Sequence, residues 1–198
     1  MMNSTLLKLL CLAAFTLGST HVVAADIRDN TGVPMPPGAL PFVTDFDGPL
    51  TLTVPGFAPV TCHVHLHTHV DYDPAGSFPL HTGISLYHVA IALSGPPPCP
   101  MLVPVPSTTG VIDNTVAPSV PPTFIDPAPI SYPPGGEPLF LPTSPTCPGP
   151  FVFHAFFGNG TGNFTDPSYI QVQISNGPCL ANGRFYSQPH PTGDVNIF

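Results

Sequence analysis

The sequence predicts an all-β protein, built as an antiparallel β-sandwich or a barrel-like domain with a long Pro-rich insertion. Three observations lead to this fold class. Proline contributes 31 of the 198 residues, and proline removes a backbone donor that an α-helix needs. Charged residues make up 7% of the chain and hydrophobic residues 42%, which argues against charge-driven disorder. Several segments alternate apolar and polar residues with the period of two that is typical of β-strands.

The clearest strand is Thr61–Asp71, in which histidine takes every second position from His63 to His69. A turn at 73–76 follows it, because Asp-Pro-Ala-Gly is typical turn chemistry. Residues 26–47, which hold several prolines, are expected to form an extended arm. The expected strands, in chain order, are 50–54, 61–71, 83–94, 151–157, 169–175, 183–187 and 195–198.

The segment 95–150 differs in composition from the rest of the chain. It contains 18 of the 31 prolines. A structureless segment longer than about 12–15 residues is unusual inside a compact domain. We therefore expect residues 95–150 to be a polyproline-II-rich excursion that rests on the surface of the domain.

The N-terminus predicts export. Lys8 is followed by an apolar run from Leu9 to Leu17, and Val23-Ala24-Ala25 supplies small residues suited to a signal peptidase. The run is shorter than the ~20 residues that span a bilayer, although an uncleaved anchor remains an alternative. We expect residues 1–25 to be a signal peptide, cleaved near Ala25. Residues 26–198 then form one domain, secreted, periplasmic or at the cell surface, with no transmembrane segment.

Charge and cysteine content narrow the class of protein further. After cleavage, Arg28 and Arg184 are the only basic residues against 11 acidic ones, so nucleic acid is not an expected partner. Cys11 is lost with the signal peptide. The four remaining cysteines predict two disulfides in an exported chain. Of the three possible pairings we favour Cys62–Cys99 and Cys147–Cys179, since each pair brackets a strand-rich block.

These two cysteine-bracketed blocks carry a family resemblance. Residues 48–99 include G-P-L-T-L-T-V, V-T-C-H-V-H-L and I-A-L-S-G-P-P-P-C, and residues 147–197 include C-P-G-P-F-V-F-H-A-F-F-G and I-S-N-G-P-C-L-A-N-G-R-F-Y-S-Q-P. This resembles the bacterial protein activator of alkane oxidation family, in which four cysteines accompany a closing C-x-x-x-G-x-hydrophobic-x-x-x-P segment. Cys179–Pro189 matches that segment, whereas the chain has no Trp, and its histidine strand and Pro-rich insertion are foreign to the family pattern.

The resemblance implies an exported, non-catalytic protein linked to growth on hydrophobic substrates, without a cofactor. It supplies no functional residues that carry over to this chain. The expected partners are therefore a hydrophobic substrate such as an alkane, or components of the extracellular matrix or cell surface.

The spacing of the histidines on the Thr61–Asp71 strand predicts a candidate metal site. Side chains at alternate positions of a strand share a face, with steps of ~6.6–6.8 Å, and neighbouring imidazoles can converge on one ion with Zn–N bonds of ~2.0–2.1 Å. A hairpin that pairs Asp71 with Ile84 would place His88 opposite His67. The candidate ligands for Cu(II) or Zn(II) are His63, His65, His67, His69 and His88.

Two other interpretations of the histidine strand stay open. It can be a polar outer face on a chain that avoids Lys, Glu and Arg. It can also be a pH sensor, because imidazoles titrate near ~6.5. His81, His154 and His190 are expected to be ordinary surface or loop histidines.

No catalytic motif stands out. The sequence lacks Gly-x-Ser-x-Gly, His-Glu-x-x-His and a phosphate-binding loop. A carboxylate pair from distant strands stays open, as does a copper oxygenase with three histidine ligands. We expect an exported non-enzymatic protein that acts at the cell surface or in the matrix and supports the use of hydrophobic substrates. The alternative is a copper- or zinc-binding protein that uses the His63–His69 strand.

Overall fold

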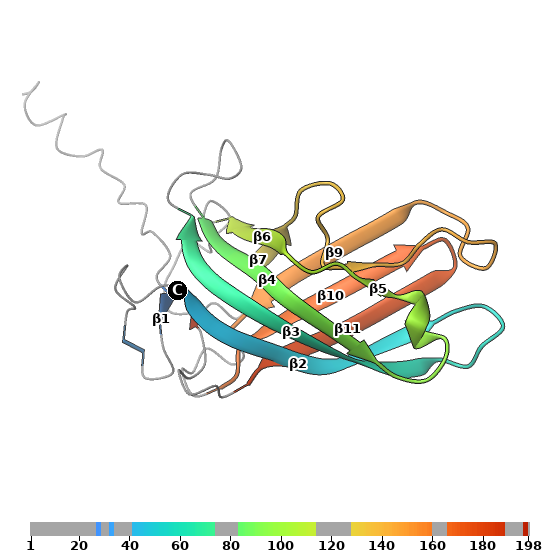
Figure 1. Ribbon diagram of the computed structural model, residues 1–198, viewed down its shortest axis with the longest axis horizontal. Helices are drawn as coiled ribbons and strands as arrows, with labels where there is room; N and C mark the ends of the chain where they lie inside the picture. Colours follow the sequence, from blue (N-terminus) through green and yellow to red (C-terminus); the bar gives the residue numbers. More distant parts are fainter. Residues whose placement is uncertain are drawn as a thin grey trace, which may run out of the picture.

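The computed structural model describes residues 27–28, 32–33, 41–73, 83–113, 128–159, 166–188 and 196–197. Eight antiparallel strands close into a barrel (Figure 1), in the order β10-β11-β2-β3-β4-β6-β7-β9. Strands make up 63% of the structure and helix 3%, so the all-β, barrel-like prediction is confirmed. The predicted signal peptide lies outside the described residues.

Each barrel strand pairs with the next barrel strand along the chain, and the last returns to pair with the first. The prediction of a hairpin between 61–71 and 83–94 is confirmed in its antiparallel pairing. The barrel strands are β2 (Phe42–Thr53), β3 (Val60–Asp73), β4 (Gly83–Ser94), β6 (Thr108–Asp113), β7 (Ala128–Ser131), β9 (Phe151–Gly158), β10 (Tyr169–Asn176) and β11 (Cys179–Ser187).

Four short strands form two ribbons beside the barrel. β1 (Ile27–Arg28) pairs with β12 (Asn196–Ile197), and β5 (Val103–Pro104) pairs with β8 (Leu139–Phe140). The 3-10 turn η2 (Cys99–Met101) lies between β4 and β5.

The Pro-rich segment is more ordered than its composition predicted. Its described residues provide β6 and β7 to the barrel wall and form the β5–β8 ribbon, so the prediction of a polyproline-II-rich excursion on the domain surface is wrong there. β6 and β7 are short, and they contain Val and Ile residues that pack well in a sheet. Most prolines fall between these strands, where no ladder donor is needed.

The expected extended arm at 26–47 is also partly wrong, because β2 begins at Phe42. Inward side chains of β2 alternate with outward ones: Phe42, Phe46 and Leu50 are buried. Phe46 meets Phe157 edge to face across the barrel, with ring centroids 6.3 Å apart. This period of two places Asp45 and Asp47 on the outside of the barrel.

Candidate functional site

Both disulfides brace the same end of the barrel. Cys62 bonds to Cys99 and Cys147 bonds to Cys179, so the predicted pairing is confirmed. The first disulfide ties the start of β3 to η2, and the second ties the loop before β9 to the start of β11. The backbone of this end is therefore cross-linked at two points.

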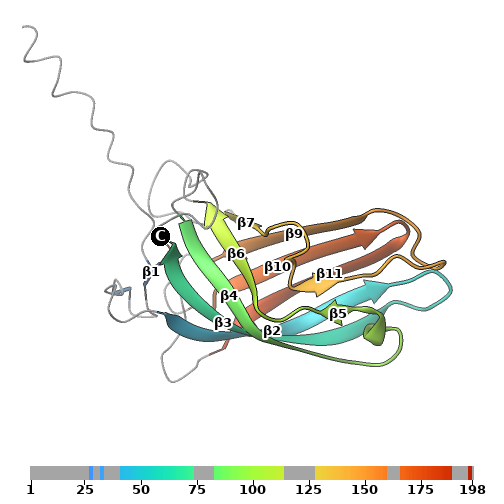
Figure 2. The same ribbon diagram turned by 45° about the horizontal axis from the view of Figure 1, so that its top comes forward.

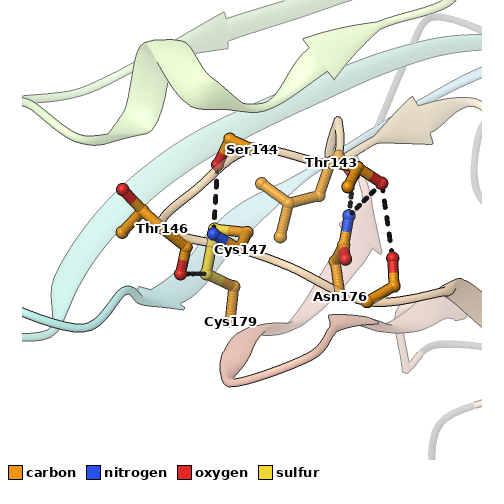
Figure 3. Close-up of a disulfide and its surroundings, with 8 residues drawn as sticks. Thr143, Ser144, Thr146, Cys147, Asn176 and Cys179 are labelled. Atoms are coloured by element: carbon orange, nitrogen blue, oxygen red, sulfur yellow. Dashed lines mark hydrogen bonds between the residues drawn. A yellow bond between two sulfur atoms is a disulfide. The ribbon is translucent and has the colours of Figure 1, made fainter.

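A hydrogen-bond network surrounds the second disulfide (Figure 3). The side-chain amide of Asn176, which is buried, donates to the Leu141 carbonyl at 2.9 Å and to Thr143 Oγ1 at 3.3 Å. The Thr143 hydroxyl donates to the Gly149 carbonyl at 3.3 Å. These bonds hold the 141–150 loop against the β10–β11 turn, so the loop has a defined shape despite its prolines.

We call this end of the molecule the apolar end, made of residues 54–59, 95–102, 141–150 and 177–180. Figures 1 and 2 show these four connections together at one end of the barrel. The sequence has no Asp, Glu, Lys or Arg in 48–70, 74–112, 138–165 or 167–183. The apolar end therefore carries no charged side chain.

Large hydrophobic side chains are exposed on the apolar end and at its margin. The exposed fractions are 54% for Phe57, 45% for Leu180, 43% for Val103 and 39% for Val152. A hollow of about 250 Å³ lies there as well, lined by Leu93, Ser94, Gly95, Cys99, Pro100, Leu102 and Pro104. Exposed apolar groups that gather in one region mark a binding surface more often than scattered ones do.

A second surface, which is polar, runs along the outside of β3. Cys62, Val64, Leu66, Thr68 and Val70 are buried, while His63, His65, His67 and His69 alternate with them on the outer side. We call these four histidines, with Asp45 and Asp47 on β2, the His–Asp face.

The register of β2 and β3 sets the contacts on the His–Asp face. Asp45 lies opposite His67, and Asp47 lies opposite His65. Oδ1 of Asp45 is 2.6 Å from His67 Nδ1 and 3.7 Å from His65 Nε2. Oδ1 of Asp47 is 3.2 Å from His63 Nε2, but this contact is not a hydrogen bond.

His69 lies apart from the carboxylates. Its ring meets the ring of His67 at 5.7 Å and the ring of Tyr87, on β4, at 6.2 Å, both edge to face. The four histidines thus have three different environments.

The placement of His88 differs from the prediction. Asp71 pairs with Ser85 rather than with Ile84, so the register is one residue off the predicted one and His88 pairs with Thr68 instead of His67. A further register shift between His67 and Thr68 pairs His67 with Ala90. A one-residue change of register moves a side chain to the other face of a sheet. His88 therefore lies inside the barrel, away from the other four predicted ligands, and the predicted register was wrong.

Inside the barrel, His88 belongs to a polar belt of Thr44, Thr68, His88 and Thr108, which are paired in turn across β2, β3, β4 and β6. All four side chains are buried. His88 Nδ1 is 2.9 Å from Thr68 Oγ1, and its Nε2 is 2.7 Å from the hydroxyl of Tyr132. Within the described residues, the hydroxyls of Thr44 and Thr108 have no hydrogen-bond partner.

Burial controls protonation in this belt. Desolvation lowers the pKa of His88 to about 4 and raises the pKa of Tyr132 well above its ordinary value. Both groups are therefore uncharged at neutral pH. A neutral imidazole offers one donor and one acceptor, which Thr68 and Tyr132 satisfy.

Tyr132 also faces a hollow in the barrel wall beside β7 and β9. This hollow measures about 320 Å³ and includes the ring of Phe153, which Tyr132 meets edge to face at 5.5 Å. Its lining residues are Pro129, Ile130, Ser131, Tyr132, Glu137, Phe153, His154, Ala155 and Phe156.

Sequence reasoning missed several of these residues. Asp45 and Asp47 flank Phe46 in a D-F-D pattern whose period of two signals an outward face. Ile84, Leu86 and His88 share one phase, which is the signal that His88 is buried. Phe57 and Leu180 carry no such signal, because their exposure depends on the tertiary fold.

Among the described residues, no set of three or more His, Cys, Asp or Glu side chains stands in a geometry that holds a metal ion. None of the described residues forms a helix long and apolar enough to cross a membrane. Comparison with protein-family models, with curated proteins and with solved structures finds no match.

Proposed function

We propose that this chain is an exported, non-catalytic protein that adsorbs through its apolar end to the surface of a water-insoluble hydrocarbon. The observation that carries the proposal is the combination, at one end of the barrel, of exposed Phe57 and Leu180 with a complete lack of charged side chains. The resemblance to the alkane oxidation activator family points to the same class of substrate.

The physical argument rests on what a hydrocarbon surface offers. It has no charge and no hydrogen-bonding group, so any charged side chain pressed against it loses solvation without compensation. Apolar side chains gain about 25 cal/mol for each Å² removed from water. An end without charges, with large exposed hydrophobic groups, is suited to such a surface.

Rigidity supports the same function. The two disulfides and the Asn176 network hold the loops of the apolar end in place. Adsorption then costs less ordering of side chains and loops than it would for a flexible segment. Disulfides are also typical of proteins that work outside the reducing cytosol, which supports export.

A hexadecane-in-water emulsion tests the proposal, because the amount of purified chain that the droplets remove from solution measures its adsorption. Phe57→Asp and Leu180→Asp should each weaken adsorption by roughly tenfold or more, because a charge must be desolvated at the surface. Tyr87→Asp is the matched control, since Tyr87 is an exposed aromatic residue on β4 outside the apolar end. Equal adsorption of all four proteins would contradict the proposal.

A genetic test addresses the biological role. Deletion of the gene should slow growth of the producing cell on alkanes but not on a soluble carbon source. Complementation with the wild-type gene should restore growth, and complementation with Phe57→Asp/Leu180→Asp should not. Unchanged growth on alkanes together with unchanged surface properties of the deletion strain would contradict the role.

A further inference from the structure

We propose that Asp45, His65 and His67 bind one divalent transition-metal ion, with Zn²⁺ as the ion best suited to the ligand set. This site is separate from the apolar end. It also differs from the ligand set that the sequence predicted, because it includes a carboxylate from β2 and excludes His88.

Backbone geometry brings the three side chains together. His65 and His67 are two residues apart on β3, so they project from the same face. Asp45 lies directly opposite His67 on β2, and paired residues of neighbouring antiparallel strands have Cβ atoms about 4.5–5.5 Å apart. The rigid wall of the barrel thus fixes the three Cβ positions.

The distances from Asp45 to each of the two imidazoles are close to those between ligands of one bound ion. Two ligands held at ~2.0–2.1 Å in a tetrahedral arrangement are roughly 3.4 Å apart. His65 Nε2 is 3.7 Å from Asp45 Oδ1, so this pair needs little change. His67 Nδ1 is 2.6 Å from the same oxygen, so this pair must widen by less than about 1 Å.

Widening that contact is a side-chain movement only. The side chains of His65 and His67 are 42% and 34% exposed, so their rings have room to rotate. The hydrogen bond between His67 and Asp45 would be replaced by bonds from both side chains to the ion. This accounts for the lack of a preformed three-ligand geometry among the described residues.

The donor types fit zinc. Two imidazole nitrogens and one carboxylate oxygen form a set that zinc accepts, with a fourth position left to water. Asp45 and Asp47 also give this face negative charge that attracts a cation. Oxygen-preferring ions such as Mg²⁺ gain little from imidazole ligands, so the site should discriminate against Mg²⁺.

His63 and His69 provide matched controls on the same strand. His63 contacts Asp47 rather than Asp45, and His69 packs between His67 and Tyr87. Neither histidine is placed to share an ion with Asp45 and His65. Loss of either ring removes one imidazole from the strand without removing a ligand.

Isothermal titration calorimetry with ZnCl₂, on the chain purified without a polyhistidine tag, tests the site. Wild type should bind one ion, and MgCl₂ should give no heat of binding. His65→Ala, His67→Ala and Asp45→Asn should each weaken Zn²⁺ affinity by at least about tenfold, whereas His63→Ala and His69→Ala should change it less than ~3-fold. Acid should release the ion, since protons compete for the imidazole nitrogens.

Three results would overturn the proposal. The first is that the wild-type chain shows no saturable Zn²⁺ binding. The second is that all four histidine variants lose the same amount of Zn²⁺ affinity. The third is that Asp45→Asn binds Zn²⁺ as tightly as the wild type does. Circular dichroism melting curves check that each variant is folded. If an alanine variant of His65 or His67 unfolds, the glutamine variant of the same residue is used in its place, because glutamine keeps a polar side chain at the same outward position.

Discussion

The polar belt inside the barrel contains two threonines, Thr44 and Thr68, that look equivalent in the sequence but differ in their hydrogen bonding. Thr68 satisfies His88 Nδ1 at 2.9 Å, whereas the Thr44 hydroxyl is buried without a partner among the described residues. A buried polar group without a hydrogen bond costs stability, and a buried group that loses its partner costs about 1–3 kcal/mol. The two residues therefore respond differently to the same isosteric change.

Thr44→Val should leave the free energy of unfolding unchanged or raise it by up to ~1 kcal/mol, because it removes an unpartnered hydroxyl. Thr68→Val should lower it by about 1–3 kcal/mol, because it leaves an imidazole nitrogen unsatisfied. Urea denaturation of both variants measures the difference. Equal effects of the two substitutions would show that the Thr68–His88 bond does not stabilise the barrel.

His88 should make stability depend on acidity. Its pKa is lowered to about 4 in the folded chain, against ~6.5 for an ordinary imidazole. Between these values the unfolded chain binds the extra proton, so the free energy of unfolding should fall by up to about 1.4 kcal/mol per pH unit as the pH drops from 6.5 toward 4. Above about pH 7.5, where the imidazole is neutral in both the folded and the unfolded chain, His88 should contribute almost no pH dependence.

His88→Gln is the control for this pH effect. Glutamine keeps hydrogen-bonding groups but does not titrate, so the variant should lose the His88 contribution to the slope between pH 4 and 6.5. Urea denaturation over that pH range measures the difference between the two proteins. An identical slope in both would assign the acid sensitivity to other groups.

At the scale of single residues, the sequence predicted the shared face of His63 to His69 but not its partners. Period-two patterning fixed which way each histidine points, whereas Asp45 was assigned to an extended arm. His88 was misplaced because Asp71 pairs with Ser85, one residue beyond the expected partner Ile84. The register depends on both strands together, whereas the phase that His88 shares with Ile84 and Leu86 on β4 already indicates its burial.

At the scale of elements, long alternating strands were predictable and short ones were not. β4 has the predicted bounds, Gly83–Ser94, and β3 extends the predicted strand by a few residues. β6 and β7 are short and lie among prolines, and such strands depend on their neighbours for stability. Because of the Pro-rich composition, the sequence therefore did not predict two strands that are necessary for closure of the barrel.

The disulfides are the elements that hold the apolar end in shape. They span 37 and 32 residues, and loops of this length predict a stabilisation of about 4 kcal/mol for each bond in the chain-entropy model. Cys147→Ser/Cys179→Ser should therefore lower the free energy of unfolding by roughly 3–4 kcal/mol.

The same variant should also weaken adsorption to hexadecane, because the 141–150 loop loses its link to β11. Single cysteine variants are unsuitable controls, since each leaves a free thiol. Comparison with Cys62→Ser/Cys99→Ser shows which of the two disulfide-linked loops contributes more to adsorption. Full adsorption by both double variants would show that a rigid apolar end is not required.

At the scale of the whole molecule, the charged residues lie outside the apolar end. The chain has a formal net charge of −8 at neutral pH, while the apolar end carries no charged side chain. Salt shortens the range of charge interactions, to about 3 Å at 1 M, but it does not weaken the burial of apolar surface.

Adsorption of the wild-type chain to hexadecane should therefore not decrease between low and high NaCl concentrations. Depletion assays across a salt series, at low coverage of the droplets, measure this dependence. A steep loss of adsorption with added salt would indicate that charged groups, rather than the apolar end, make the contact. Tyr87→Asp should follow the wild-type salt dependence.

The pairing of β11 with β2 has a consequence for how the chain folds. Every other wall contact joins strands that follow one another in the barrel, so those hairpins can form as the chain emerges from the ribosome or a membrane pore. The β2 edge has to wait for Cys179–Ser187, more than a hundred residues later. Until then it is an open strand edge that can pair with another chain. Partners that keep newly synthesised chains apart should therefore act before this last strand arrives, and truncation before Cys179 should leave a product that aggregates.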